Sequence, residues 1–219
     1  MHFLITAGGT REYIDPVRFI SNASSGRMGY ALARAALKVG HKVILITAPT
    51  NLRKPAGAKV VDVETSAQMC KAVKADFENC DCLIMAAAVS DYTPAKVSRT
   101  KIKKTDQSLA IKLKPTTDIL KWAGRNKGKA RIVAGFALED KNLRRNAEKK
   151  LTEKNLDMII ANAPTAIGRE KSTVEIKTPH SDWAVIANAS KAIIAKGVVM
   201  QIAKLALDKN LTLPADHKL

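Results

Sequence analysis

The sequence predicts an α/β protein with a Rossmann-like, mostly parallel sheet, helices on both faces and an antiparallel extension at one edge. Short, continuously apolar runs recur along the chain and are typical of strands buried on both faces. Stretches of helical length separate these runs, so that strand, helix and strand alternate. Towards the C-terminus, two extended segments flank a tight turn and indicate an edge hairpin.

The first half of the chain supplies the opening strands and helices. The apolar run at residues 3–7 ends at Gly8-Gly9 and is too short for a helix, which indicates a buried strand. The following helix begins late, near Ser24-Ser25-Gly26, where the hydroxyls suit an N-cap, and it ends at Gly40. The alternation then continues with strands at residues 43–46, 60–63 and 82–87 and a helix at residues 66–79.

The second half repeats the pattern and adds the edge. We expect strands at residues 132–136 and 158–161, with a polar helix at residues 140–154 between them. Residues 173–178 and 183–186 flank the turn Pro179-His180-Ser181-Asp182 and form the predicted hairpin. An amphipathic helix from Ser190 to about Leu207 follows.

Length and composition favour one domain over residues 1–219. The regular pattern breaks at residues 89–117, and a connection of that length is more often functional than not. We expect a mobile, Lys-rich loop at about residues 92–114. We expect no membrane span and no secretion signal, hence a cytoplasmic protein. The three cysteines, Cys70, Cys80 and Cys82, fit neither a disulfide framework nor a zinc site, and no metal-binding side chains are predicted.

The charge of the chain calls for an anionic partner. The formal net charge is +17, and residues 96–154 hold 18 Lys and Arg against six Asp and Glu. Nucleic acid, a membrane surface and a small polyphosphate all match such an excess. Aromatic residues make up only 4% of the chain, so side chains for base stacking are scarce and no nucleic-acid partner is expected. A polyanion-binding protein on the same fold remains an alternative.

The loops after the strands are where a ligand is expected, because parallel sheets bind ligands beyond the carboxyl ends of their strands. Small residues at a helix start expose backbone N–H groups that suit a phosphate. An NAD(P)-dependent oxidoreductase is a less favoured alternative, because about fifteen residues separate Gly8-Gly9 from the helix. The second strand also ends in Thr47-Ala48-Pro49 without a ribose-binding acid, and Pro94 disrupts a Tyr92–Lys96 pair.

Several runs together resemble the phosphopantothenoylcysteine synthetase family. The longest are GGTREYIDPVR at residues 8–18 and ISNASSGRMG at residues 20–29. The further matches follow in the family's order at residues 86–92, 101–104, 118–120, 135–137 and 161–162. The resemblance covers roughly residues 3 to 205, as a stand-alone synthetase domain.

The resemblance implies a ligase of coenzyme A biosynthesis. Such an enzyme joins 4'-phosphopantothenate to L-cysteine through an acyl-nucleotidylate and releases pyrophosphate, here with CTP favoured and ATP possible. It also implies Mg²⁺ with the nucleotide, no flavin, a homodimer and possibly a separate phosphopantothenoylcysteine decarboxylase as a partner. Thr117 and the run Leu138-Glu139-Asp140 depart from the family's pattern, which leaves the base preference open.

The resemblance further implies roles for individual residues. Asn22 and Lys101 are the expected catalytic residues. The expected substrate contacts are Arg18, Asn22, Ala86, Ala87 and Asp91. The expected nucleotide contacts are Gly9, Ser24, Gly26, Gly29, Asp91, Lys101, Asp118, Ile119, Phe136, Lys150, Lys154 and Asn162.

Overall fold

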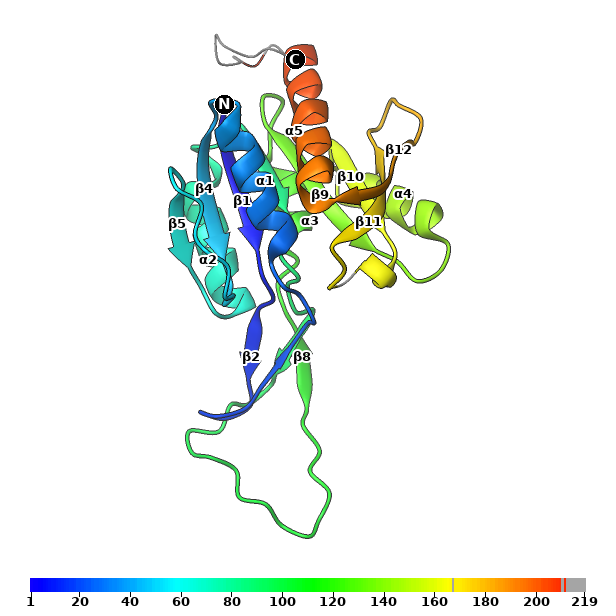
Figure 1. Cartoon of the computed structure of the whole chain (residues 1–219). Coiled ribbons are helices and arrows are strands. Elements are labelled where there is room, and N and C mark those ends of the chain that lie inside the picture. Colours follow the sequence, from blue (N-terminus) through cyan, green and yellow to red (C-terminus); the bar gives the residue numbers. More distant parts are fainter. Residues whose placement is uncertain (167, 210, 212–219) are drawn as a thin grey trace.

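The computed structural model describes residues 1–166, 168–209 and 211, and its centre is an eight-stranded sheet (Figure 1). In spatial order the strands are β12 (Ala184–Ser190), β11 (Lys171–Lys177), β10 (Met158–Asn162), β9 (Ile132–Leu138), β6 (Cys82–Met85), β1 (His2–Ala7), β4 (Lys42–Thr47) and β5 (Lys59–Asp62). The six strands from β10 to β5 pair in parallel, whereas β11 and β12 pair antiparallel at the edge. The predicted fold class is therefore confirmed.

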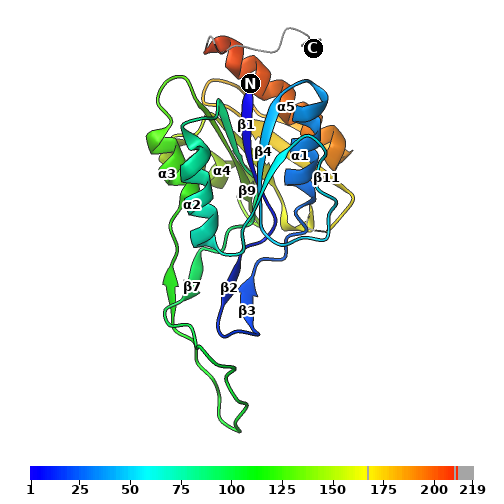
Figure 2. The same ribbon diagram turned by 90° about the vertical axis from the view of Figure 1, so that its left-hand side faces the viewer.

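Helices cover both faces of this sheet (Figure 2). Helices α1 (Arg27–Lys38) and α5 (Lys191–Asp208) pack against each other and share one apolar core with one face. Helices α2 (Ser66–Phe77), α3 (Ile119–Asn126) and α4 (Leu143–Glu153) cover the opposite face around a second core. In the part of the chain that the structure describes, no helix combines the length and apolar character that a membrane crossing requires.

The start of α1 differs from the prediction. Its N-cap is Gly26, with φ of 73°, and no side chain caps the helix. The hydroxyls of Ser24 and Ser25 therefore do not act as N-caps. Glycine suits this position because it adopts a positive φ without the steric cost that a Cβ brings. Helix α4 also begins later than expected, at Leu143.

Two short hairpins project from one end of the sheet (Figures 1 and 2). One pairs β2 (Arg11–Tyr13) with β3 (Phe19–Ser21), and the other pairs β7 (Tyr92–Pro94) with β8 (Leu113–Pro115). The sequence did not predict them, because three-residue strands are too short to show a period. Helix α3 and the short 3₁₀ helix η1 (Pro164–Ala166) were missed for the same reason of length.

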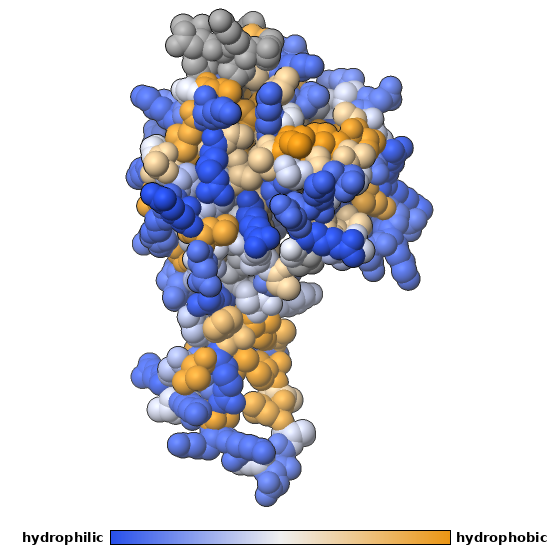
Figure 3. Space-filling view, in the orientation of Figure 1, coloured by the Kyte–Doolittle hydropathy of each residue, from blue (hydrophilic) through white to orange (hydrophobic). Residues whose placement is uncertain are grey.

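The projecting hairpins carry much exposed apolar surface (Figure 3). The exposed side chains there are Val17, Phe19, Ile20, Tyr92, Val97 and Leu113. The loop between β7 and β8 spans residues 95–112 and contains the Lys-rich stretch that the sequence singled out. The structure thus places this stretch away from the sheet, beyond its ligand-binding edge.

Candidate functional site

The candidate site lies where the order of the sheet reverses. From β1 the chain builds outward through β4 and β5, then returns to β6 on the other side of β1. The loops after β1 and β6 therefore diverge at the carboxyl ends of adjacent parallel strands, which is where α/β sheets bind ligands. Backbone hydrogen bonds join them: Thr10 N donates to Ala88 O at 3.3 Å and Ala88 N to Gly8 O at 2.8 Å.

Asn22 bridges these two loops. Its Nδ2 lies 3.2 Å from Val89 O and 3.4 Å from Ala88 O, so the side chain ties the segment before α1 to the loop after β6. A Cβ at Gly9 would lie 2.8 Å from Asn22 O, so only glycine admits this close approach. The structure therefore brings the predicted residues Gly9 and Asn22 together at the switch point.

The start of α1 forms the part of the site that suits an anion. Gly26 N donates to Ser24 Oγ at 3.4 Å, and Ser24 N donates to Asn22 O at 2.8 Å. The N-terminal turn of a helix offers N–H groups and a partial positive charge that favour an anion. Ser24 and Gly26 thus lie at an anion-compatible end of a 12-residue helix, beside Asn22.

Gly29 has a packing reason for being glycine. A Cβ at this position would lie 2.5 Å from Ala7 Cβ and 2.8 Å from Thr6 O. The missing side chain lets α1 approach β1 closely, which brings the helix start over the end of the strand. Gly29 therefore shapes the site through helix–strand packing.

Buried hydroxyls that the sequence did not single out hold the rim together. Ser90 N donates to Thr10 Oγ1 at 2.9 Å, and both side chains are buried. Thr116 Oγ1 donates to Ser90 O at 2.7 Å. Thr10 and Ser90 lie within the runs at residues 8–18 and 86–92 that resemble the synthetase family. A hydroxyl residue in the loop after a buried strand was the sequence signal that could have identified them.

The predicted substrate residues after β6 lie in this scaffold. Ala87 N donates to Thr6 Oγ1 at 3.1 Å, and Ala86 and Ala87 are half-buried. Asp91 is exposed, while its backbone O accepts a hydrogen bond from Thr116 N at 2.9 Å. Small side chains at this edge leave room beside the strand ends, and Asp91 is held by its backbone.

Asp118 and Lys154 form an ion pair at the next position along the rim. Lys154 Nζ lies 2.9 Å from Asp118 Oδ2, and Asp118 Oδ1 accepts from Lys121 N at 2.9 Å as the N-cap of α3. Burial opposes ionisation of Asp118, but the Lys121 N–H and the Lys154 ammonium outweigh it and lower the pKa. Ile119, the first residue of α3, is buried.

The remaining predicted contacts lie at the ends of β9 and β10. Lys150 in α4 pairs with Glu139, so Lys150 and Lys154, which directly follows α4, both pair with carboxylates from neighbouring loops. Glu139 N donates to Asn162 O at 3.0 Å, which joins the two strand ends. Phe136 is half-buried in β9 and packs against the core shared with α1 and α5.

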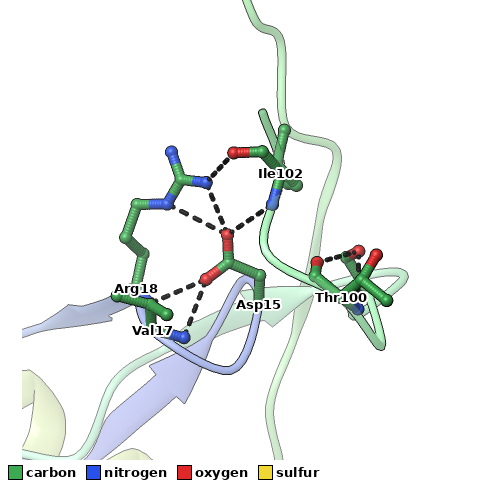
Figure 4. A network of polar contacts seen from close by, with 6 residues as sticks. Asp15, Val17, Arg18, Thr100 and Ile102 are labelled. Atoms are coloured by element: carbon green, nitrogen blue, oxygen red, sulfur yellow. Dashed lines mark hydrogen bonds and ion pairs between the residues drawn. The ribbon is translucent and has the colours of Figure 1, made fainter. Parts of the chain in front are cut away.

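Arg18 and Lys101 are not brought to the strand ends. Arg18 binds the Asp15 carboxylate within the β2–β3 turn, and Lys101 is exposed in the loop between β7 and β8 (Figure 4 shows the Arg18 contacts). The two positions nevertheless adjoin, because Arg18 Nη2 also donates to Ile102 O at 2.6 Å. These two predicted residues therefore form a second group on the projecting hairpins.

A large cavity opens on the β4 side of the rim, with a volume of about 1340 Å³. It shares only Ser24 with the predicted site residues. Its charged lining residues are Arg11, Arg27, Lys54, Lys71, Asp62 and Glu64. We place the candidate site at Asn22 because the hydrogen bonds converge there, and cavity size alone does not identify chemistry.

Comparison with known proteins shows one family over nearly the whole chain. Residues 1–206 match the family described as the DNA/pantothenate metabolism flavoprotein C-terminal domain. The coenzyme A biosynthesis bifunctional protein CoaBC of Bacillus subtilis (strain 168) is 48% identical over 210 residues, covering 94% of this chain and 52% of that protein. A cysteine/cysteine sulfinic acid decarboxylase of an unknown prokaryotic organism is 42% identical, covering 92% of this chain and 57% of its own.

Solved structures share the architecture. The crystal structure of the C-terminal domain of CoaBC superposes with a TM-score of 0.83 at 38% identity, covering 94% of this chain and 96% of that one. A Cab2 mutant in complex with phosphopantothenate-cysteine has a TM-score of 0.77 at 21% identity, covering 95% and 88%. The second likeness shows the fold alone.

These descriptions contradict the expected ligase and correct several expectations. The family is named for a flavoprotein, against the expected absence of flavin, and one relative is named as a decarboxylase. The synthetase assignment, its partners CTP or ATP, phosphopantothenate and cysteine, and its Mg²⁺ are therefore not carried forward. Among the described residues, no group of three or more His, Cys, Asp or Glu side chains is arranged to hold a metal ion.

The chain spans about half the length of the curated relatives it matches. The bifunctional activity is named for a protein of which this chain spans about half, so the name does not assign either activity to this half. Coenzyme A biosynthesis is the part of the expectation that agrees with the relatives' names. On the match over residues 1–206, the chain belongs to the DNA/pantothenate metabolism flavoprotein C-terminal domain family.

Proposed function

We propose that this chain binds a phosphopantothenate–cysteine conjugate at the rim between β1 and β6, as part of coenzyme A biosynthesis. The observation that carries the proposal is the Asn22 side chain, whose Nδ2 joins the segment before α1 to the loop after β6. The phosphopantothenate-cysteine bound in the Cab2 structure supports the choice of compound, and the relatives' names support the pathway.

The charges and small residues of the rim suit the two ends of such a compound. We assign the phosphate to the start of α1, where Ser24 and Gly26 lie and where the helix dipole favours an anion. We assign the half-buried Ala86 and Ala87, with Asp91, to the pantothenate part and Asn22 to the reacting group. We assign Arg18 and Lys101 to contacts that reach the compound from the projecting hairpins, outside the strand ends.

The remaining predicted contacts form an outer group along the rim. Lys150 and Lys154 are cations that can meet further phosphate oxygens, although each is paired with a carboxylate in the free chain. Gly9 and Gly29 act through close packing, and the other members of the group are Asp118, Ile119, Phe136 and Asn162. We assign these residues to the edge of the phosphate-binding region.

The family name implies a flavin, and the described residues of this chain do not fit one. A flavin ring is normally held between apolar or aromatic side chains. Tyr30 is the only aromatic side chain in the lining of the large cavity, and it is 1% exposed. Tyr13 and Phe19 pack edge to face against each other on the hairpin, at 5.6 Å between ring centroids. We therefore derive no step through a flavin.

We further propose that the protein works in the cytoplasm. Its three cysteines are free and buried, as is usual for a protein of a reducing compartment. Burial raises the pKa of the Cys80 thiol to about 12, although the nearby Arg131 charge opposes the shift. That thiol is therefore a poor nucleophile at neutral pH.

Isothermal titration of the purified chain with the phosphopantothenate–cysteine conjugate tests the proposal. Asn22→Asp removes the amide donor to Val89 O and adds a negative charge beside the phosphate region, so we expect the Kd to rise about tenfold or more, since one such contact is worth roughly 1–1.5 kcal/mol. Asn79→Asp makes the same charge change after α2, at the opposite end of the strands, and should leave the Kd unchanged. No binding by the parent chain, or equal Kd values for both variants, would contradict the proposal.

A further inference from the structure

A buried carboxylate organises the turn of the β2–β3 hairpin (Figure 4). The Asp15 side chain has no solvent exposure. Its Oδ1 accepts from Val17 N and Arg18 N, both at 2.9 Å, and its Oδ2 accepts from Arg18 Nε at 3.0 Å and Nη2 at 2.6 Å. Burial opposes ionisation, but these N–H donors hold the pKa of Asp15 well below its ordinary range. The group is therefore ionised at neutral pH.

The same two side chains also bind the loop between β7 and β8 through hydrogen bonds. Ile102 N donates to Asp15 Oδ2 at 3.1 Å, while Arg18 Nη2 donates to Ile102 O at 2.6 Å. Both backbone groups of one loop residue are thus held by one ion pair. Ser98 N adds a bond to Ile14 O at 2.9 Å, so the first part of the loop lies along the hairpin turn.

The loop needs such an attachment because repulsion between its own positive charges opposes a single ordered conformation. Residues 95–112 contain Lys96, Arg99, Lys101, Lys103, Lys104 and Lys112 against one acid, Asp106. Like charges on one segment repel and extend it. Arg18 adds a further cation, but the Asp15 carboxylate neutralises its charge. The Arg18 guanidinium can therefore donate a hydrogen bond to this basic loop without adding to the repulsion.

We propose that Asp15 and Arg18 are positioning residues that fix the base of the 95–112 loop at Ile102 and so set the place of the neighbouring Lys101. Asp15 and Arg18 act through the backbone of Ile102, one residue beyond Lys101. The consequence for ligand binding rests on the proposed function, in which Lys101 contacts the conjugate. The anchoring itself is independent of any ligand.

The anchoring is tested by the mobility of a spin label in the loop. Gln107→Cys provides an exposed attachment site, while the native cysteines are buried. We expect Asp15→Asn to narrow the electron paramagnetic resonance line of the full chain, because it removes the charge that holds Arg18 and one acceptor for Ile102 N. Asp76→Asn removes the ion pair with Lys59 on the main body and should leave the line unchanged.

A second pair of variants tests the same bond from the loop side. Ile102→Pro deletes the N–H that Asp15 accepts, whereas Ile102→Ala keeps it and shortens only the side chain. The proposal requires the resonance line to narrow with Ile102→Pro and to change little with Ile102→Ala. This comparison remains decisive even where Asp15→Asn fails to fold. Equal lines for Pro and Ala would overturn the anchoring.

A double-mutant cycle tests whether Asp15 acts through Lys101. Asp15→Asn and Lys101→Ala should each raise the Kd of the phosphopantothenate–cysteine conjugate about fivefold, and the double variant should be no weaker than Lys101→Ala, because residues acting through one contact are not additive. Additive effects would overturn the positioning role. Absence of binding by the parent chain would overturn the proposed function, while the line widths would still decide the anchoring.

Discussion

The Asp118 carboxylate makes two contacts that a substitution can separate. Oδ1 caps α3 through Lys121 N, and Oδ2 pairs with Lys154 Nζ. Asn retains the capping oxygen and loses the charge, whereas Ala loses both. We expect Asp118→Ala to lower the free energy of unfolding by about 1 kcal/mol through the lost cap. Asp118→Asn should lower it by at most about 0.5 kcal/mol, because the side chain is 43% exposed and solvent screens the pair.

The stability difference between the parent chain and Asp118→Asn depends on pH in a definite direction. The pKa of Asp118 is lowered in the folded chain, so its charge stabilises the fold above the ordinary Asp pKa of about 4 and the contribution is lost as pH falls through the lowered value. Urea unfolding of the parent and Asp118→Asn should therefore differ at pH 7, and the difference should shrink as the pH falls below the ordinary Asp pKa of about 4. A gap that widens towards low pH would contradict the ion pair as the cause.

Individual site residues were predictable where they stand beside a strand end. Gly9, Asn22, Ser24 and Gly26 lie at the switch point because the chain leaves β1 at this edge and begins α1 beside it. The helix caps were harder to predict, because nothing in the residues before α1 distinguishes a Ser N-cap from Gly26 at positive φ. The contacts of Arg18 depend on the course of a long loop, which local sequence does not encode.

Helix α1 illustrates how one packing contact places a site. Its distance from β1 depends on Gly29, where a Cβ would meet Ala7 and the Thr6 carbonyl. Backbone atoms cannot move aside as a flexible side chain can, so the helix would have to shift. The first turn of α1, with its N–H groups, would shift with it.

Gly29→Ala should therefore destabilise the protein by about 1–3 kcal/mol, as overpacking does in a well-filled core. Gly197→Ala in α5 is the matched control, because its added Cβ meets only the far end of the Ile186 side chain. There the gain in helix propensity, about 1 kcal/mol at most, offsets the adjustment of Ile186. Chemical denaturation of both variants measures the difference, and equal midpoints would contradict the packing argument.

At the scale of elements, long patterned segments were predicted well and short ones poorly. The strands of the central sheet and helices α1, α2, α4 and α5 match apolar runs or helical spacing. Hairpins β2–β3 and β7–β8 are stabilised by long-range contacts, such as Ser98 N to Ile14 O, that have no local pattern. They carry Arg18 and border the loop with Lys101, so the second group of predicted residues could not be placed from sequence.

For the whole molecule, alternating buried strands and helices were enough to predict the parallel sheet, but not its strand order. The reversal between β1 and β6 arises from the pairing of distant strands, and it determines where the ligand-binding edge lies. The fold does not determine the activity. The relatives are about twice as long as this chain and bifunctional, so their names do not say which activity belongs to this half. The proposed phosphate region at the start of α1 lies at the ligand-binding edge, beside Asn22.

The measurement that tests this account most directly is mass spectrometry of the phosphopantothenate–cysteine conjugate after incubation with the purified chain and FMN. We expect the conjugate to bind with its carboxylate intact and FMN not to be retained. Loss of carbon dioxide from the conjugate, with FMN bound to the chain, would contradict it.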